Sequence, residues 1–363
     1  HTISVADFAL QPLPQGMVQG RVRGADGAVA GARLYVAEAP SVQTFTDSAG
    51  HYQWSLPRGT HQLVVEGTGY RRAAVTVAVN AGATQSADIA IEQAPSILLV
   101  EADAFRGWFS GWPIAEFFQS ALREEGYAYT TWPLQYADRT DTFPRADGST
   151  GYGVPSLATL AQYDLVIWAD SACNVGTQGC FTYNGPTALG ASAALQHYMD
   201  QGGRLILSGQ DLGFWEDGAP LFTDYLHAAL VADRMAGTGS TLTGHGFLSG
   251  LQITLTNASL YGYANGALQL APDAVVAEGA AAAVYPALTY DDGQLPAALA
   301  IDPCEADYRA LYFAMGYENI GVRGQWRDRA AATALGRSIA WVMGQRQAND
   351  VELVVDNVLR FGE

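Results

Sequence analysis

Carboxylates stand at or just after the ends of three apolar runs that are typical of β-strands. Asp103 ends the run 96–103, Asp170 ends the run 164–170, and Asp211 follows the run 204–208. In a doubly wound sheet, ligands bind beyond the carboxyl ends of the strands, so we expect these side chains to line one crevice. The predicted crevice contains Asp103, Arg106, Trp108, Trp112, Asp170, Gln210, Asp211 and Trp215.

Three carboxylates with one arginine and several aromatic rings could hold a sugar, a peptide or a hard cation such as calcium. The alternative is structural. In that interpretation Asp211 caps the helix after it, Asp103 and Asp170 cap helices or form turns, and the tryptophans fill the crevice. We therefore assign no metal ligand and predict no cofactor, with calcium as the one alternative.

The cysteines Cys173 and Cys180 enclose a short loop that contains glycine and asparagine. This spacing favours a local disulfide, which would remove about 2–3 kcal/mol of unfolded-state entropy. A zinc site would need further ligands, and none is evident in the loop. The disulfide predicts a protein that is secreted or held at the cell surface. Cys304 is interpreted as a small buried residue, with a reactive thiol as the alternative.

The composition excludes several classes of function. The 363 residues carry 19 basic and 36 acidic side chains, a formal net charge of −17, which argues against binding to nucleic acid. All of the basic residues are arginine, so chemistry that depends on a lysine amine is excluded. No apolar run approaches the roughly 20 residues that span a membrane.

Short predicted strands alternate with turn residues from residue 16 to residue 94. The separators 25–27, 47–50 and 57–59 contain the glycine, proline, aspartate and serine that turns prefer. This pattern predicts a small all-β sandwich. The predicted strands are 17–23, 33–37, 44–46, 51–56, 61–66, 73–79 and 86–92.

Four segments of this region, 19–22, 30–32, 46–52 and 56–61, together resemble the carboxypeptidase regulatory-like (transthyretin-like) module. The resemblance implies an immunoglobulin- or transthyretin-like sandwich that serves as a spacer or binding module and has no chemistry of its own.

A short internal repeat precedes this region. Ala-Asp-Phe-Ala-Leu at 6–10 matches Ala-Asp-Ile-Ala-Ile at 87–91, inside the last predicted strand of the sandwich. We therefore predict that residues 1–15 are the last strand of a preceding module in a longer protein. Alternating strands resemble one another, so chance similarity is the alternative.

The hydrophobic pattern changes after residue 94. Apolar strands are predicted at 96–103, 127–133, 164–170, 204–208, 284–290, 297–301 and 308–315, and helices near 114–122, 157–163, 187–201, 211–230 and 326–343. Strands that are apolar on both faces and separated by helices predict an α/β fold with a parallel, doubly wound sheet.

Three segments of this second region, 163–168, 202–209 and 308–318, resemble the class I glutamine amidotransferase-like domain, which implies a flavodoxin-like sheet. Such a domain after a regulatory-like module resembles the region C-terminal to the catalytic domain in secreted bacterial subtilisin-like serine proteases. The predicted division is 1–15, 16–94, 95–350 and a C-terminal extension, 351–363.

In active amidotransferase-like proteins a cysteine nucleophile follows the strand that 204–208 matches. Here that stretch is Ser-Gly-Gln-Asp-Leu-Gly, and only Glu318 remains where the family has a His-x-Glu motif. Ser208 lies inside the strand rather than at the turn, so we interpret it as structural. The tripeptides of a subtilisin-like triad are also missing, so the active site of such a parent would lie outside this chain.

The expected function is therefore that of a non-catalytic accessory region, a pseudoenzyme that positions a protease domain or binds peptide or glycan. Its expected partners are the upstream domains of the same polypeptide, with no nucleic acid and no membrane span. The alternative is a hydrolase that uses Asp211 or Cys173 as its nucleophile.

Overall fold

The computed structural model describes the chain as two compact units. The first contains His1–Ala94 together with Gly126–Ala128, and the second contains Pro95–Glu125 and Tyr129–Glu363. Within these units the structure describes residues 12–102, 115–134, 143–144, 150–151, 153–170, 175–176, 179–180, 185–233, 241–255, 272–278, 284–291, 295–320 and 329–344.

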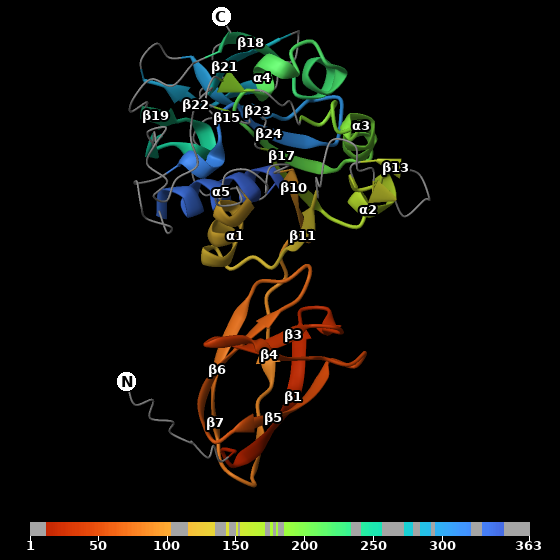
Figure 1. The fold of residues 1–363 in the computed structure, drawn as a ribbon, viewed down its shortest axis with the longest axis vertical. Helices are drawn as coiled ribbons and strands as arrows, with labels where there is room; N and C mark the ends of the chain where they lie inside the picture. Colours follow the sequence, from red (N-terminus) through yellow and green to blue (C-terminus); the bar gives the residue numbers. More distant parts are fainter. Residues whose placement is uncertain are drawn as a thin grey trace, which may run out of the picture. The chain divides into compact units, whose positions relative to one another are not determined.

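The first unit is a sandwich of two sheets, as predicted (Figure 1). One sheet has the order β2-β1-β5, with β8 and β9 also pairing with β1, and the other has the order β4-β3-β6-β7. The strands of the first sheet are β1 (Gln15–Gly24), β2 (Gly27–Ala28), β5 (His51–Pro57), β8 (Thr84–Ser86) and β9 (Ile89–Ala90). Those of the second are β3 (Arg33–Val36), β4 (Ala39–Phe45), β6 (Gly59–Glu66) and β7 (Ala73–Val79).

Alternating side chains form the core of this sandwich. In β5, Tyr52 and Leu56 are buried, whereas His51, Gln53 and Ser55 point to solvent. A strand with a period of two buries one face only, so each sheet contributes its apolar face to a common core. That core includes Val18, Val22, Leu34, Leu56, Leu63, Val65 and Val77.

The predicted strand 86–92 is interrupted in the structure. Strands β8 and β9 pair with β1 in parallel, and residues 87–88 between them belong to neither strand. The carbonyl oxygen of Ala87 accepts the hydroxyl of Tyr52 at 2.6 Å, and Asp88 Oδ1 accepts the backbone N–H of Arg21 at 2.9 Å. Side chains therefore supply contacts where the strand ladder stops.

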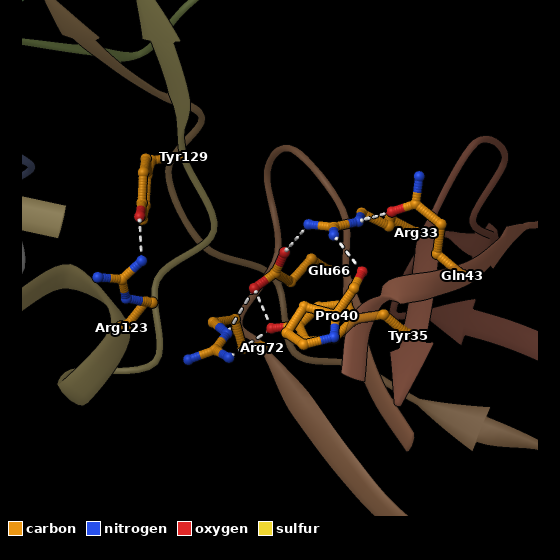
Figure 2. A network of polar contacts seen from close by, with 8 residues as sticks. All are labelled: Arg33, Tyr35, Pro40, Gln43, Glu66, Arg72, Arg123 and Tyr129. Atoms are coloured by element: carbon orange, nitrogen blue, oxygen red, sulfur yellow. Dashed lines mark hydrogen bonds and ion pairs between the residues drawn. The ribbon is translucent and has the colours of Figure 1, made fainter. Parts of the chain in front are cut away.

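A polar network joins the second sheet of the sandwich to the segment before β7 (Figure 2). Glu66 pairs with Arg72, with 2.7 Å between Oε1 and Nε, and with Arg33 at 3.6 Å, and it accepts the hydroxyl of Tyr35 at 2.9 Å. The guanidinium of Arg33 also lies over the ring of Tyr35, 4.5 Å from the ring centroid. One carboxylate thus holds three side chains, which defines this corner of the sandwich.

The second unit is built on a nine-stranded sheet whose order is β11-β10-β14-β17-β24-β23-β22-β19-β20. The first five of these strands are parallel, whereas the last four pair antiparallel. The prediction of a parallel sheet is therefore right for one half only. The parallel strands are β10 (Ile97–Ala102), β11 (Thr130–Pro133), β14 (Leu165–Asp170), β17 (Arg204–Ser208) and β24 (Arg309–Phe313). The antiparallel strands are β19 (Thr241–Gly244), β20 (Gln252–Thr254), β22 (Val284–Tyr290) and β23 (Pro296–Ile301).

Helices cover both faces of the parallel half (Figure 1). The helices α1 (Ala115–Glu124) and α5 (Arg329–Val342) pack against each other, and Gln119 of α1 donates to Glu101 of β10 at 2.7 Å. The other face packs Leu98, Val166 and Leu205 of the sheet with α2 (Leu157–Leu160) and α3 (Ser192–Asp200). Burial on both faces explains why β10, β14 and β17 are almost continuously apolar.

Several short elements complete the second unit. Two small hairpins join β12 (Phe143–Pro144) to β13 (Thr150–Gly151) and β15 (Val175–Gly176) to β16 (Gly179–Cys180). Two 3-10 turns occur at Gly246–Leu248 and Tyr317–Asn319. Among the described residues, no helix is both long enough and apolar enough to cross a membrane.

The segment after β17 departs most from the prediction of a helix over 211–230. It forms a short helix α4 (Leu212–Trp215), a π-helical turn (Leu221–Tyr225) and the strand β18 (Ala228–Asp233). Gly218 adopts a left-handed backbone with φ 75° and Pro220 lacks a donor N–H, so a continuous helix cannot pass through them. β18 then pairs antiparallel with β21 (Asp273–Ala277).

Candidate functional site

Asp211 occupies the turn between β17 and α4 in a left-handed backbone conformation, with φ 66°. A residue other than glycine costs about 1–2 kcal/mol there, so the surrounding structure must hold it. Asp211 is the N-cap residue of α4 by position, as one of the two interpretations expected, but its side chain makes no capping hydrogen bond to the helix. Its Oδ2 instead accepts the indole N–H of Trp215 at 2.8 Å.

Two further carboxylates come from the β18–β21 pair. Asp233 ends β18, Asp273 begins β21, and the two residues are cross-strand partners. The register shifts between Leu230 and Ala232, so Val231 is an extra residue on β18. Directly opposed residues share one face of a sheet, so this bulge is what places Asp233 beside Asp273.

Asp211, Asp233 and Asp273 form one cluster, with one carboxylate oxygen from each lying within 4.8 Å of the others. The three differ in exposure: Asp273 is 0% exposed, Asp211 is 4% exposed, and Asp233 is at the surface. Asp273 Oδ2 accepts the backbone N–H of Phe214 at 3.2 Å, whereas its Oδ1 is buried without a hydrogen-bond partner. The cluster therefore runs from solvent into the interior.

Burial raises the pKa values of the two inner carboxyls. The pKa of Asp211 rises to about 6, because desolvation outweighs the hydrogen bond from Trp215. The pKa of Asp273 rises to about 8, through desolvation and then the charge of Asp211, against the backbone N–H groups of Phe214 and Gly213. At neutral pH the inner pair therefore holds about one proton.

The other described residues of the predicted crevice are less accessible than we expected. Asp170 and Gln210 are buried at 0% and 3% exposure, and Asp170 Oδ2 accepts the indole N–H of Trp168 at 3.2 Å. Trp215 is 41% exposed, and the ring of Phe214, 48% exposed, lies edge-on to it at 5.3 Å. The remaining predicted residues Asp103, Arg106, Trp108 and Trp112 lie outside the described residues, as do Cys173 and the side chain of Cys180.

Asp233, Asp273 and Phe214 were not predicted as site residues from the sequence. The only sequence signal for Asp273 is its place between Pro272 and the apolar run 274–276, which is typical of a strand start. Asp233 was not recognised as the end of a strand, because a helix was predicted up to residue 230 and no strand was predicted there. Neither position could be linked to Asp211 without the pairing of β18 with β21.

Ser208 is held as a structural residue, as predicted. Its hydroxyl donates to the carbonyl of Met315 at 3.2 Å and accepts the backbone N–H of Tyr317 at 3.0 Å. With 1% exposure it meets no solvent. Glu318 is also buried, at 3% exposure, and its carboxylate folds over Gly316.

Replacing Ser208 by alanine is expected to destabilise the second unit by about 1–3 kcal/mol, because two buried hydrogen bonds, to Met315 and from Tyr317, are lost. Urea unfolding followed by tryptophan fluorescence measures this loss. Ser338→Ala is the matched control, since Ser338 is equally buried but only donates to Ala334. Equal losses in both variants would contradict the role assigned to Ser208.

Cys304 is exposed, so its interpretation as a buried residue is wrong. It lies between β23 and β24, in the turn after Pro303. Loops that connect strands run over the protein surface, which explains the exposure.

Comparison with known proteins identifies the first unit. Residues 17–92 match the carboxypeptidase regulatory-like domain. This confirms the resemblance drawn from segments 19–61. Among curated proteins no match is found.

Similarities to solved structures such as the following cover less than a third of the chain. They include the Bacillus anthracis TIE protein, at 20% identity over 24% of this chain and 19% of that one, with a TM-score of 0.21. The minor pilin GBS52 of Streptococcus agalactiae is 20% identical over 23% of this chain and 46% of its own, with a TM-score of 0.19. A DUF3823 family protein of Parabacteroides merdae is 18% identical over 23% and 49%, with a TM-score of 0.20. The chain thus spans between about a fifth and about a half of these proteins.

Proposed function

We propose that the second unit is an amidotransferase-like domain of flavodoxin type whose nucleophile position is taken by Asp211. The parallel strands, taken in chain order as first to fifth, have the spatial order 2-1-3-4-5, which is the flavodoxin-like order. The turn after the fourth parallel strand, where active relatives have cysteine, holds Asp211 at φ 66°. This left-handed turn is the observation that carries the proposal.

The proposed function is non-catalytic binding of peptide or glycan at the carboxyl end of β17. Asp211 is 4% exposed and one of its oxygens accepts a hydrogen bond from Trp215. Its carboxylate is therefore poorly placed to attack a substrate as a nucleophile. Beside it, Phe214 and Trp215 present apolar rings to solvent, which suits contact with a peptide or the face of a sugar. Within the described part of the chain, the carboxylate cluster includes no histidine that could act as a base.

The proposed setting is a larger exported protein, with a subtilisin-like serine protease as the parent. This rests on the order of the two domains and on the cysteine pair 173 and 180. The upstream domains of that polypeptide would be the partners. The two units would position a catalytic domain that lies elsewhere, or would bring bound material to it.

Binding is tested by titrating the whole chain with peptides and oligosaccharides while following tryptophan fluorescence. We expect a saturable change that Phe214→Ala weakens at least about tenfold, because one ring of the exposed pair is lost. Phe45→Ala is the matched control, because Phe45 is 55% exposed but belongs to β4 of the sandwich. A response that both variants weaken equally, or no response to any ligand, would contradict this site.

A hydrolase acting through Asp211 is the second candidate function, and the left-handed turn favours it because nucleophiles often occupy such turns. A turnover screen with ester, amide and glycoside substrates tests it. Loss of turnover in Asp211→Asn but not in Cys173→Ala would support this candidate. Turnover that is unchanged in both variants would remove it.

The predicted export is tested by counting thiols in protein purified from an oxidising compartment and then unfolded. We expect one reactive thiol before reduction, from the exposed Cys304, and three after reduction. Cys304→Ser is the control and should leave none before reduction. Three thiols without reduction would remove the argument for export and make Cys173 the leading catalytic candidate.

A further inference from the structure

We propose that Asp211, Asp233 and Asp273 bind one hard divalent cation, with calcium as the best fit and magnesium as the alternative. The proposal stands on the geometry of the cluster and is independent of the proposed binding of peptide or glycan.

The spacing of the three carboxylates suits a shared ion. Their nearest oxygens all lie within 4.8 Å of one another. Two oxygens bound to the same calcium ion are at most about 5 Å apart, which is twice the Ca–O distance. Three oxygens spread evenly around one calcium ion lie at most about 4.5 Å apart, and around magnesium at most about 3.6 Å. The 4.8 Å spacing is therefore nearer to what calcium needs, with a slight closing of the carboxylates onto the ion.

A buried polar atom of the cluster points to a missing ligand. The Oδ1 of Asp273 has no hydrogen-bond partner, and the residue is 0% exposed. Buried polar groups are nearly always paired, and a cation bound at Oδ1 would satisfy this atom.

The charge of the cluster also calls for a cation. The ion pairs of the described residues involve other carboxylates, and none of them includes Asp211, Asp233 or Asp273. Three carboxylates packed this closely repel one another wherever they are ionised. A divalent ion would replace this repulsion with attraction.

The donor set selects the class of metal. All three ligands are carboxylate oxygens, which hard cations prefer, whereas zinc sites usually contain histidine or cysteine. Trp215 engages Asp211 Oδ2, which leaves Oδ1 for a metal. Asp233 is exposed, so water can reach the ion and complete its coordination.

The test is calorimetric titration of the whole chain, freed of metal with a chelator, against calcium, magnesium and zinc chlorides at pH 8. We expect about one calcium per chain, with weaker magnesium binding and an unfolding midpoint that rises with calcium concentration. Asp233→Asn should weaken calcium binding at least about tenfold without loss of folding, because this residue is at the surface. Asp273→Asn should do the same from the buried side. The matched control is Asp224→Asn, an exposed aspartate that accepts a hydrogen bond from Thr223 and lies outside the cluster.

Three results would overturn the proposal. The first is no saturable binding of calcium or magnesium up to about 10 mM, well above the roughly 1 mM typical of weak extracellular calcium modules. The second is calcium binding that Asp233→Asn and Asp273→Asn leave as strong as in Asp224→Asn. The third is binding of zinc alone. In the first case the inner carboxyls would be neutralised by a shared proton rather than by a metal.

Discussion

Metal-free protein is expected to lose stability as the pH rises from about 4 to about 8, and Asp273→Asn should remove most of this loss. In the folded state burial raises the pKa of Asp273 from 3.8 to about 8. The folded protein therefore keeps a proton through a pH range in which the unfolded chain has released it. Asparagine has the same shape, cannot ionise, and can donate its amide N–H to Asp211.

The sign follows from proton linkage. Below pH 3.8 both states carry the proton and the group has no effect on folding. Between 3.8 and about 8 the folded state holds one proton more than the unfolded state, so the free energy of unfolding falls by about 1.4 kcal/mol per pH unit. Above about 8 both states are ionised and the dependence on this group ends. The neighbouring Asp211, with a pKa of about 6, adds to the slope in the lower part of the range.

The measurement is urea unfolding at several pH values in the presence of a chelator, followed by tryptophan fluorescence. Trp54 is the only tryptophan in residues 1–94, so Trp54→Phe as a background confines the signal to the second unit. Asp224→Asn is again the control and should keep the slope of the parent protein. A slope that is the same in Asp273→Asn and in the parent would show that Asp273 is ionised in the folded state. Added calcium should stabilise the parent most at high pH, where the ligands carry their charge.

Gly20→Ala is expected to destabilise the first unit by about 3 kcal/mol or more, while the second unit keeps its stability. Position 20 lies in β1, where a Cβ atom would be 1.9 Å from the carbonyl oxygen of Ala87. Ala87 cannot retreat easily, because its N–H donates to Gln19 at 2.8 Å and its carbonyl accepts the hydroxyl of Tyr52. The overlap must therefore open the pairing of β1 with its neighbours.

Hydrogen exchange, followed peptide by peptide in increasing urea, separates the two units. In Gly20→Ala the amides of β1 and β5 should lose protection at lower urea than in the parent, and those of β17 and β24 should not change. Gly67→Ala is the matched control, because the nearest atom to its Cβ is 3.4 Å away. An equal loss in both variants would show that the close approach at Ala87 does not limit stability. A loss in β17 and β24 would show that the two units unfold together.

The local pattern of the sequence was enough to predict most strands and the layout of the first unit. In β17 and β22 the predicted bounds 204–208 and 284–290 coincide with those in the structure, because each is a mainly apolar run that ends at a glycine or an aspartate. The sandwich followed from turn residues and alternation, and the match of 17–92 to the carboxypeptidase regulatory-like domain confirms it. These signals are local, since a strand exposes or buries its own side chains at a period of two.

The candidate site could be predicted only in part. Asp211 was placed at the strand end from its position after 204–208, and Trp215 was placed near it. Their hydrogen bond and the left-handed turn depend on how α4 packs, which no residue pattern displays. The helix predicted over 211–230 failed because Gly218 and Pro220 stop it and because β21, some forty residues later, offers residues 228–233 a partner strand.

Residue types and their spacing therefore determine that this chain holds a β-sandwich followed by an α/β region with acidic strand ends and no cysteine after the strand 204–208. Only the tertiary structure decides that half of the second sheet is antiparallel and that Asp233 and Asp273 join Asp211. The reason is physical. Burial patterns report the surroundings of one residue at a time, whereas a carboxylate cluster arises from pairing between distant segments and from a one-residue bulge that sets which side chains face each other.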